Sequence, residues 1–278
     1  MQQPLISVIV PCYNQSIYMD ECLQSVLDQT YQNWECIMVN DGSPDHTEEV
    51  ALQWTEKDTR FIYLKKENGG LSSARNAGIE IAKGEWILPL DCDDKIGSQY
   101  LELASAQFDK DYTIIYCEAE FFGDKEGKME LPDFSFEEFA IKNLIFCTAF
   151  FKKDNWINVN GYDEKIVNGY EDWEFWISIL NVNSKCYKIP SINFYYRAKE
   201  NSMTKDFHYF ENEKIQTLKY IYKKHSIFFI DHIKIPYQML YLKYKDLETE
   251  KEVYKKAYHS KRYKFGNFFF SLIDKLKK

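Results

Sequence analysis

Short apolar runs alternate with amphipathic stretches over the first ninety residues. The run at 5–10 is rich in β-branched residues and stops at Pro11, and residues 17–27 then place apolar side chains at helical spacing. This cycle repeats and predicts strands at 5–10, 34–39, 61–64 and 86–90, with helices at 17–27, 44–54 and 72–83, the second opened by Ser43 as N-cap. Strands separated by helices of this length imply parallel pairing, so we expect an α/β sheet.

The pattern is mixed beyond residue 100. It predicts strands at 112–117 and 146–151 and an aromatic-faced helix at 170–180, and the chain is helix-like from His208 to its interruption at Pro236. We therefore expect a domain at 1–205, with halves at 1–100 and 101–205, followed by a helical extension at 206–278.

Three polar segments directly follow predicted strands, at residues 11–14, 40–43 and 91–94. In open α/β sheets, ligands bind beyond the carboxyl ends of the strands. The chemistry of this protein is therefore expected at that edge.

Charge divides the chain into two parts. Of its 278 residues, 1–206 hold 19 Lys and Arg against 35 Asp and Glu, and the rest hold 16 against 8. The acidic part argues against a nucleic-acid surface, because phosphate contacts need clustered cations. The end of the basic part, residues 254–278, interleaves eight Lys and Arg with aromatic residues. It fits an interfacial helix on an anionic membrane or a packed helix with snorkelling lysines, and we favour the membrane.

Cysteines and apolar runs bear on the compartment. The seven cysteines include no Cys-x-x-Cys pair, so neither a disulfide framework nor a zinc site is indicated. No stretch of eighteen apolar residues and no basic leader occurs, so we expect a cytoplasmic protein.

The carboxylates Asp91, Asp93 and Asp94 fall within four residues, directly after an apolar strand. Such proximity costs energy unless a cation neutralises the charges, and oxygen ligands suit Mg²⁺ or Mn²⁺. The segment predicts a divalent metal site. The alternative is a solvated acidic turn.

Three further segments carry candidate chemistry. Asp41, in a strand-ending turn, can accept hydrogen bonds from a heterocycle or a ribose, or the turn is an ordinary one. Gly70 and Arg75 belong to a glycine-rich loop that opens a helix, which is a fair anion site or a common turn. Glu171 and Asp172 begin an aromatic helix and serve either as helix-dipole partners or as a general base.

In this order the segments resemble the family 2 glycosyltransferases of the GT-A fold, over roughly the first 205 residues. The matching stretches are Ser-Val-Ile-Val-Pro-Cys-Tyr-Asn at 7–14, Asn-Asp-Gly-Ser at 40–43, the glycine-rich loop at 70–78, Asp-Cys-Asp-Asp at 91–94, and Gly-Tyr-Asp-Glu at 161–164 followed by 171–172. Five matching motifs in the same order along the chain are not expected by chance.

The resemblance implies an inverting transfer of a sugar from a nucleotide-sugar donor, by default a UDP-sugar, to the hydroxyl of a glycan or lipid-linked acceptor. It divides the domain into a nucleotide-binding half, 1–100, and an acceptor half, 101–205. The donor would be bound by Pro11, Tyr13, Asn14, Asp41, Gly70, Arg75 and Asp91, with Tyr13 and Asp41 at the base. Asp91, Asp93 and Asp94 would hold Mn²⁺ or Mg²⁺, and Asp172, beside Glu171, would be the base.

One position departs from the family pattern. Many members carry a histidine two residues after the Arg of the segment at 193–204, where this chain has Lys199. A protonated lysine cannot ligate a metal but can pair with a diphosphate, which weakens the case for metal dependence. Alternatively, 193–197 is an edge strand and Lys199 a solvated charge. Trp176 is expected in the core, and Trp173 is the better candidate for an acceptor-facing ring.

Two other classes of function compete. A dinucleotide-dependent oxidoreductase is disfavoured because no Gly-x-Gly-x-x-Gly follows the first strand. A non-catalytic sugar-nucleotide binder or scaffold, with a membrane-associating tail, would not need both the acidic triplet and the Glu171-Asp172 pair.

Overall fold

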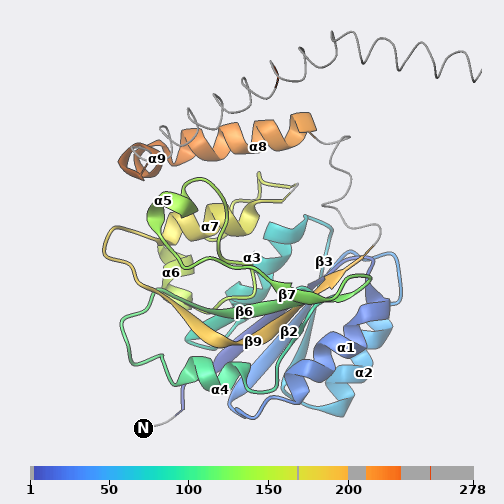
Figure 1. Cartoon of the computed structure of the whole chain (residues 1–278). Coiled ribbons are helices and arrows are strands. Elements are labelled where there is room, and N and C mark those ends of the chain that lie inside the picture. Colours follow the sequence, from blue (N-terminus) through green and yellow to red (C-terminus); the bar gives the residue numbers. More distant parts are fainter. Residues whose placement is uncertain (1–2, 168, 200–210, 233–250, 252–278) are drawn as a thin grey trace, which may run out of the picture.

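A five-stranded sheet with strand order β3-β2-β1-β4-β8 lies at the centre of the fold (Figure 1). We analysed a computed structural model, which describes residues 3–167, 169–199, 211–232 and 251. The strands β1 (Ile6–Cys12), β2 (Trp34–Asp41), β3 (Phe61–Lys66) and β4 (Trp86–Pro89) are parallel, and β8 (Phe151–Lys152) runs antiparallel to β4. The predicted parallel α/β sheet is confirmed.

Helices α1 (Ser16–Leu27), α2 (Thr47–Lys57) and α3 (Leu71–Ile81) connect these strands. Every residue of β1 and β2 is buried, as expected for strands covered on both faces. Alternate side chains enter two separate cores: Val8 packs with residues of α1 and α2, whereas Ile9 packs with residues of α3. The two-residue periodicity of a strand thus distributes the apolar run between two faces.

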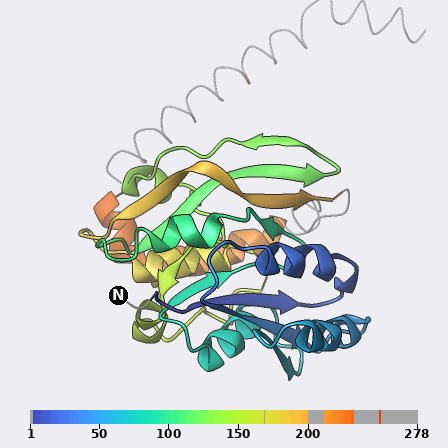
Figure 2. The ribbon, with the colours of Figure 1, turned by 90° about the horizontal axis from the view of Figure 1, so that it is seen from below.

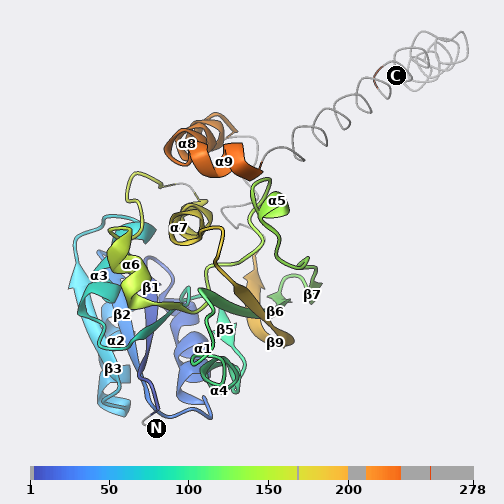
Figure 3. The ribbon, with the colours of Figure 1, turned by 90° about the vertical axis from the view of Figure 1, so that its left-hand side faces the viewer.

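A second sheet, of order β5-β9-β6-β7, packs beside the first (Figures 2 and 3). Its strands are β5 (Lys95–Ile96), β6 (Ile114–Gly123), β7 (Gly127–Met129) and β9 (Cys186–Ala198), and only the β6–β9 pair is parallel. Because β9 lies between β5 and β6, the edge-strand interpretation of 193–197 is wrong. The short helices α4 (Tyr100–Ser105), α5 (Phe136–Phe139) and α6 (Lys153–Asn158), with α7 (Glu171–Ile179), complete this part.

Two predicted elements differ from the structure. The helix expected from residue 44 begins at Thr47, because the Ser43 hydroxyl accepts a hydrogen bond from the Asn14 amide at 2.7 Å and donates to Asp45 instead of capping a helix. The strand expected at 146–151 is reduced to β8 and an isolated bridge between Ile115 and Phe150. In both segments, contacts with distant parts of the chain override the local sequence pattern.

Helices α8 (Glu211–Lys224) and α9 (Ser226–His232) lie over α7 and α5 (Figures 1 and 3). Ile221 of α8 and Phe229 of α9 are buried in the same core as α7. Within the described part of the chain, no helix combines the length and apolar character needed to cross a bilayer. The basic segment 254–278 lies outside the described residues.

Candidate active site

The carboxyl ends of β1, β2 and β4 meet at one edge of the first sheet. Cys12 is in register with Asn40, and the Leu90 amide donates to the Ile9 carbonyl at 2.9 Å. The predicted segments 11–14, 40–43 and 91–94 therefore come together. Pro11 is buried within β1, whereas the Tyr13 ring just beyond it is 51% exposed. Asn14 follows, with a left-handed backbone (φ 53°).

Asp41 is buried and surrounded by hydrogen-bond donors. Its Oδ1 accepts from Lys66 Nζ at 2.6 Å and from the Gly69 amide at 3.0 Å, and its Oδ2 accepts from the Gly70 amide at 2.8 Å. Gly70 has a φ of 85°, which a residue with a Cβ rarely adopts. Asp41 thus fixes the glycine-rich loop beside the sheet edge, and a carboxylate retains room for a further donor.

Arg75 is fully buried and bridges two carboxylates. Its Nη2 lies 2.7 Å from Asp91 Oδ1 and its Nη1 lies 3.0 Å from Glu171 Oε1. The expectation that this guanidinium is open to an anionic ligand is therefore wrong, because the side chain is buried between the carboxylates of Asp91 and Glu171. Instead, Arg75 joins the acidic motif after β4 to the start of α7.

Asp93 forms an ion pair with Lys199, whose Nζ lies 2.6 Å from Asp93 Oδ2. The ammonium also lies 4.2 Å from the centre of the Tyr18 ring. Burial raises the pKa of Asp93, as does repulsion by Asp91, and Lys199 offsets only part of this effect. The contact brings β9 to the acidic motif and makes Lys199 part of the site.

Asp94 has a different environment from its two neighbours. It is 2% exposed, and its Oδ1 accepts a hydrogen bond from the Arg197 amide at 2.8 Å. Burial raises its pKa, with further contributions from Asp93 and Asp91. Asp94 fixes the acidic motif to the second sheet.

The three carboxylates of the acidic motif do not fit a shared divalent cation as they are arranged in this structure. Asp91 is paired with Arg75 and Asp93 with Lys199, so each carboxylate already has a cationic partner. Across the described ranges, no group of three or more His, Cys, Asp or Glu side chains is arranged to hold a metal. The expected three-carboxylate site is thus not formed by these side chains, because two are charge-paired and the third binds a backbone amide.

Asp172 occupies the second position of α7. The preceding residues Gly169 and Tyr170 both have left-handed backbones, with φ of 87° and 70°, which sets the sharp entry into the helix. Asp172 Oδ2 accepts from Asn143 Nδ2 at 2.9 Å, and Oδ1 accepts from the Trp173 amide at 2.7 Å. In the described residues, no Lys, Arg or His lies within ion-pair distance of this carboxylate.

Burial raises the pKa of Asp172 to about 7, and repulsion by Glu171 adds to the increase, although Arg75 opposes it. A carboxylate with a pKa near neutrality is matched to accepting a proton at neutral pH. Of the two carboxylates at the start of α7, Glu171 is therefore bound to Arg75, whereas Asp172 is suited to act as a base.

The two tryptophans of α7 are both in the core. Trp176 is fully buried, as predicted, and donates to the Ile145 carbonyl at 3.0 Å. Trp173 is 2% exposed and donates to the Phe139 carbonyl at 3.0 Å. The expectation of an acceptor-facing Trp173 ring is therefore wrong, because α5 and α9 cover the face of α7 on which it lies.

Cys147 is a neighbour of the site that the sequence did not indicate. Its Sγ lies 3.5 Å from Asp91 Oδ2, at donor distance, and burial raises the pKa of this thiol. A neutral thiol is a weak hydrogen-bond donor. Cys92, between the acidic residues, is buried as predicted.

A parallel sheet whose strand ends face a second, mixed sheet is the GT-A glycosyltransferase fold. Staphylococcus aureus TarS 1-349, solved in complex with UDP-GlcNAc, aligns with a TM-score of 0.59 at 23% identity over 72% of this chain and 60% of that one. The mannosyltransferase PcManGT from Pyrobaculum calidifontis, solved with GDP-Man and Mn²⁺, aligns with a TM-score of 0.55 at 18% identity over 73% of this chain and 59% of its own.

The chain belongs to glycosyl transferase family 2, whose family model matches residues 7–172. A curated relative, the glycosyltransferase GlyG of Streptococcus pneumoniae serotype 4, is 37% identical over 147 residues, which cover 51% of this chain and 49% of GlyG. The match thus spans about half the length of that relative.

Proposed function

We propose that this protein is an inverting glycosyltransferase that moves a sugar from a nucleotide-sugar donor to an acceptor hydroxyl during glycan synthesis. The observation that carries the proposal is Asp172, whose pKa is raised to about 7 and which is joined through Glu171 and Arg75 to the acidic motif. Such a carboxylate can take the proton of the acceptor.

In the proposed reaction, the acceptor oxygen attacks the anomeric carbon from the side opposite the diphosphate. A new carbon–oxygen bond forms, the bond to the nucleoside diphosphate breaks, and that group leaves with the electron pair. Asp172 receives the hydroxyl proton. One carboxylate is enough for this single displacement, so no cysteine is needed as a nucleophile.

The donor would lie along the edge formed by the ends of β1, β2 and β4. Tyr13 offers an exposed ring for the base, with Pro11 and Asn14 beside it, and Asp41 and Gly70 border the same edge. Asp91 would contact the ribose side of the donor. We propose a uridine nucleotide first, because TarS was solved with UDP-GlcNAc, and a guanosine nucleotide second, because PcManGT was solved with GDP-Man.

Lys199 would pair with the diphosphate. Its ammonium lies at the acidic motif, and its side chain is 19% exposed, so an anion can approach it. A divalent cation, if bound, would supply Lewis-acid stabilisation of the leaving diphosphate. Asp91 and Asp93 already have cationic partners, so in the proposed reaction the positive charge beside the diphosphate comes from Lys199.

Donor binding tests the proposal directly. UDP-, GDP- and dTDP-sugars should be screened by thermal shift with Mn²⁺ and with EDTA, because a ligand of the native state raises its stability by RT ln(1 + [L]/Kd). We expect one nucleotide class to stabilise the protein and to be retained in EDTA, and a coupled assay to detect release of the nucleoside diphosphate. Binding without any release would indicate the non-catalytic binder instead.

Variants of Lys199 complete this experiment. Lys199→Met should weaken donor binding about tenfold, the size of one lost charge-assisted contact, in both conditions, and Lys199→Arg should restore most of it. Lys152→Met is a control, because its side chain is 43% exposed and pairs loosely with Glu85 at 3.8 Å. Donor binding that requires Mn²⁺ and ignores Lys199 would contradict the assignment of the charge to this residue.

The domain division at residues 100 and 205, the acceptor class and the membrane role of 254–278 remain predictions. The acceptor half, 101–205, would contain α7 and the strands β6, β7 and β9 of the second sheet.

A further inference from the structure

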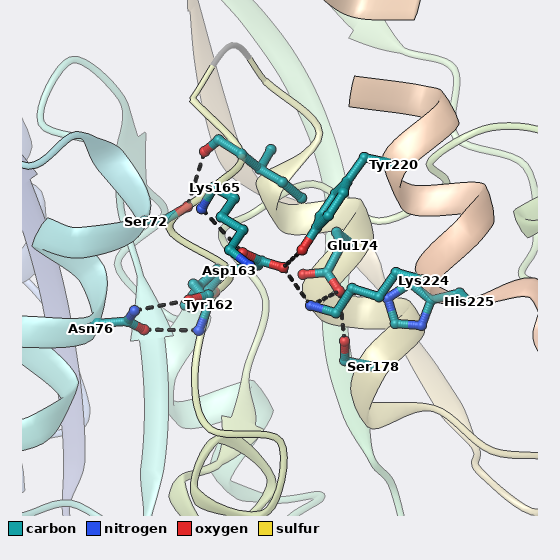
Figure 4. Close-up of polar contacts among 11 residues, drawn as sticks. Ser72, Asn76, Tyr162, Asp163, Lys165, Glu174, Ser178, Tyr220, Lys224 and His225 are labelled. Atoms are coloured by element: carbon teal, nitrogen blue, oxygen red, sulfur yellow. Dashed lines mark hydrogen bonds and ion pairs between the residues drawn. The ribbon is translucent and has the colours of Figure 1, made fainter. Parts of the chain in front are cut away.

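We propose that helix α8 positions the end of α7 that carries Asp172. The positioning residues are Lys224, which ends α8, and His225, which follows it. This inference rests on the proposed role of Asp172. The residues concerned form one polar cluster between α7, the loop residues 161–167 and α8 (Figure 4).

Glu174 is the centre of this cluster. It lies on α7 two residues after Asp172, and its side chain is 1% exposed. Its Oε1 is contacted by His225 Nε2 at 2.5 Å, Lys224 Nζ at 2.9 Å and Ser178 Oγ at 2.9 Å. Burying a carboxylate is costly unless it is paired, so α8 supplies the charge that lets α7 bury Glu174.

The same ammonium reaches a second carboxylate. Lys224 Nζ lies 2.6 Å from Asp163 Oδ2, which also accepts from the Tyr220 hydroxyl at 2.8 Å. Tyr220 and Lys224 are four residues apart and therefore lie on one face of α8. Lys224 thus links α7 to the loop that leads into it.

The other side of this loop is bound to α3. The Asn76 side chain accepts from the Tyr162 amide at 2.8 Å and donates to the Tyr162 carbonyl at 2.9 Å (Figure 4). The loop therefore spans from α3, which carries Arg75, to α8. It then continues into Glu171 and Asp172.

Helix geometry shows why fixing Glu174 matters for Asp172. Residues two apart on an α-helix are separated by about 200° around its axis, so α8 holds α7 from the side roughly opposite Asp172. Phe229 of α9 packs edge-on against Trp173 at 6.1 Å between ring centres. Together these contacts set the rotation of α7, and thereby the direction of the Asp172 carboxylate.

The test compares Lys224→Met with the matched control Lys223→Met, a substitution of the neighbouring exposed lysine. Misplacing a base by about 1 Å can cost up to 100-fold in rate. We expect Lys224→Met to lower kcat/KM for the acceptor about tenfold or more while the Kd for the donor nucleotide stays within about twofold. Lys224→Arg should recover much of the loss, and Lys223→Met should match the wild type.

Hydrogen exchange provides a readout independent of activity. Lys224→Met should speed amide exchange at 161–178 but leave β1 and β2 unchanged. Tyr220→Phe removes one hydroxyl only and should show the same pattern more weakly, which preserves the test if Lys224→Met folds poorly.

The proposal is overturned if Lys224→Met and Lys223→Met behave alike, or if donor binding falls as much as transfer. If the wild-type protein neither binds nor transfers a nucleotide sugar, the proposed function fails. The exchange experiment would still decide whether α8 positions α7.

Discussion

Two carboxylates on opposite faces of α7, Glu174 and Asp172, have pKa values that are shifted in opposite directions. Glu174, on the side of α8, is paired with Lys224 and hydrogen-bonded to His225. Burial raises its pKa, but the contacts with His225 and Lys224 outweigh burial and hold the pKa below its usual value. Asp172, on the side of the proposed reaction, is bonded to the Asn143 amide, and burial raises its pKa to about 7. The chemical nature of the partner, beyond burial itself, decides which carboxylate is charged at neutral pH.

The sheet edge follows the rule seen at Glu174. Asp41 is paired with Lys66, Asp91 with Arg75, and Asp93 with Lys199. These carboxylates fix loops and strands at the proposed donor side. Asp172 is free of such a pair among the described residues, and this difference supports its proposed role as the base.

The strongest way to break this comparison is Asp172→Asn. The amide keeps the size of the side chain but cannot accept the acceptor's proton, so transfer should fall about 10²- to 10⁴-fold while donor binding is kept. Rates are measured with nucleotide sugar and acceptor, and the melting temperature reports folding. Asp154→Asn, at an exposed position of α6, is the control and should transfer normally. Full transfer by a folded Asp172→Asn protein would refute the assignment.

The next largest effect is expected from replacing Arg75, the cation that pairs with Asp91 and Glu171. Arg75→Gln leaves Asp91 and Glu171 without their buried partner, and the free energy of unfolding should fall by about 3–5 kcal/mol, as for broken buried ion pairs. Because Arg75 also lowers the pKa of Asp172, the acid limb of the transfer rate should move to higher pH.

Two controls accompany Arg75→Gln. Arg75→Lys retains the charge, so its acid limb should stay near that of the wild type, and it serves if the glutamine variant does not fold. Lys65→Gln breaks the exposed pair with Glu48 and should cost less than about 1 kcal/mol. Equal losses in Arg75→Gln and Lys65→Gln would show that the buried bridge has no special role.

The smallest expected effect is the pH dependence of the wild-type enzyme. Asp172 acts as a base only when deprotonated, so the rate should fall about tenfold per unit below pH 7 and level off above it. A midpoint near pH 4, the ordinary value for an aspartate, would contradict the raised pKa.

The free energy of unfolding should also depend on the protonation of Asp172, but it should decrease as the pH rises, whereas the transfer rate increases. The folded state binds the Asp172 proton more tightly than the unfolded state, so this contribution is full below pH 3.8 and is lost as the pH rises to about 7. The difference in unfolding free energy between the wild type and Asp172→Asn should follow that window.

Much of the fold was predictable because β1 to β4 are predominantly apolar and are separated by amphipathic helices. The edge rule for parallel sheets placed residues 11–14, 40–43 and 91–94 together, and it could also have found Lys66, which ends β3. Asn143 and Cys147 could not be found this way, because they lie in irregular chain and reach the site through tertiary packing.

Two of the predictions that were wrong share one cause. Arg75 and Trp173 carry groups that suit a ligand, a guanidinium and an indole, but residue type does not reveal which side of a helix is covered. The structure buries Arg75 between two carboxylates and Trp173 beneath α5 and α9. Solvent exposure, which depends on the packing of distant segments, decided both cases.

The Arg75 bridge limits how chimeric enzymes can be built from this chain. It unites α3, the motif after β4 and the start of α7, so a crossover between residues 91 and 171 separates Arg75 and Asp91 from Glu171. A parent lacking a carboxylate at the position of Glu171 would leave Nη1 of the buried guanidinium without its partner, although Asp91 would still pair with Nη2. Exchanging acceptor specificity by recombination therefore requires parents that share this trio, or a compensating change at Arg75.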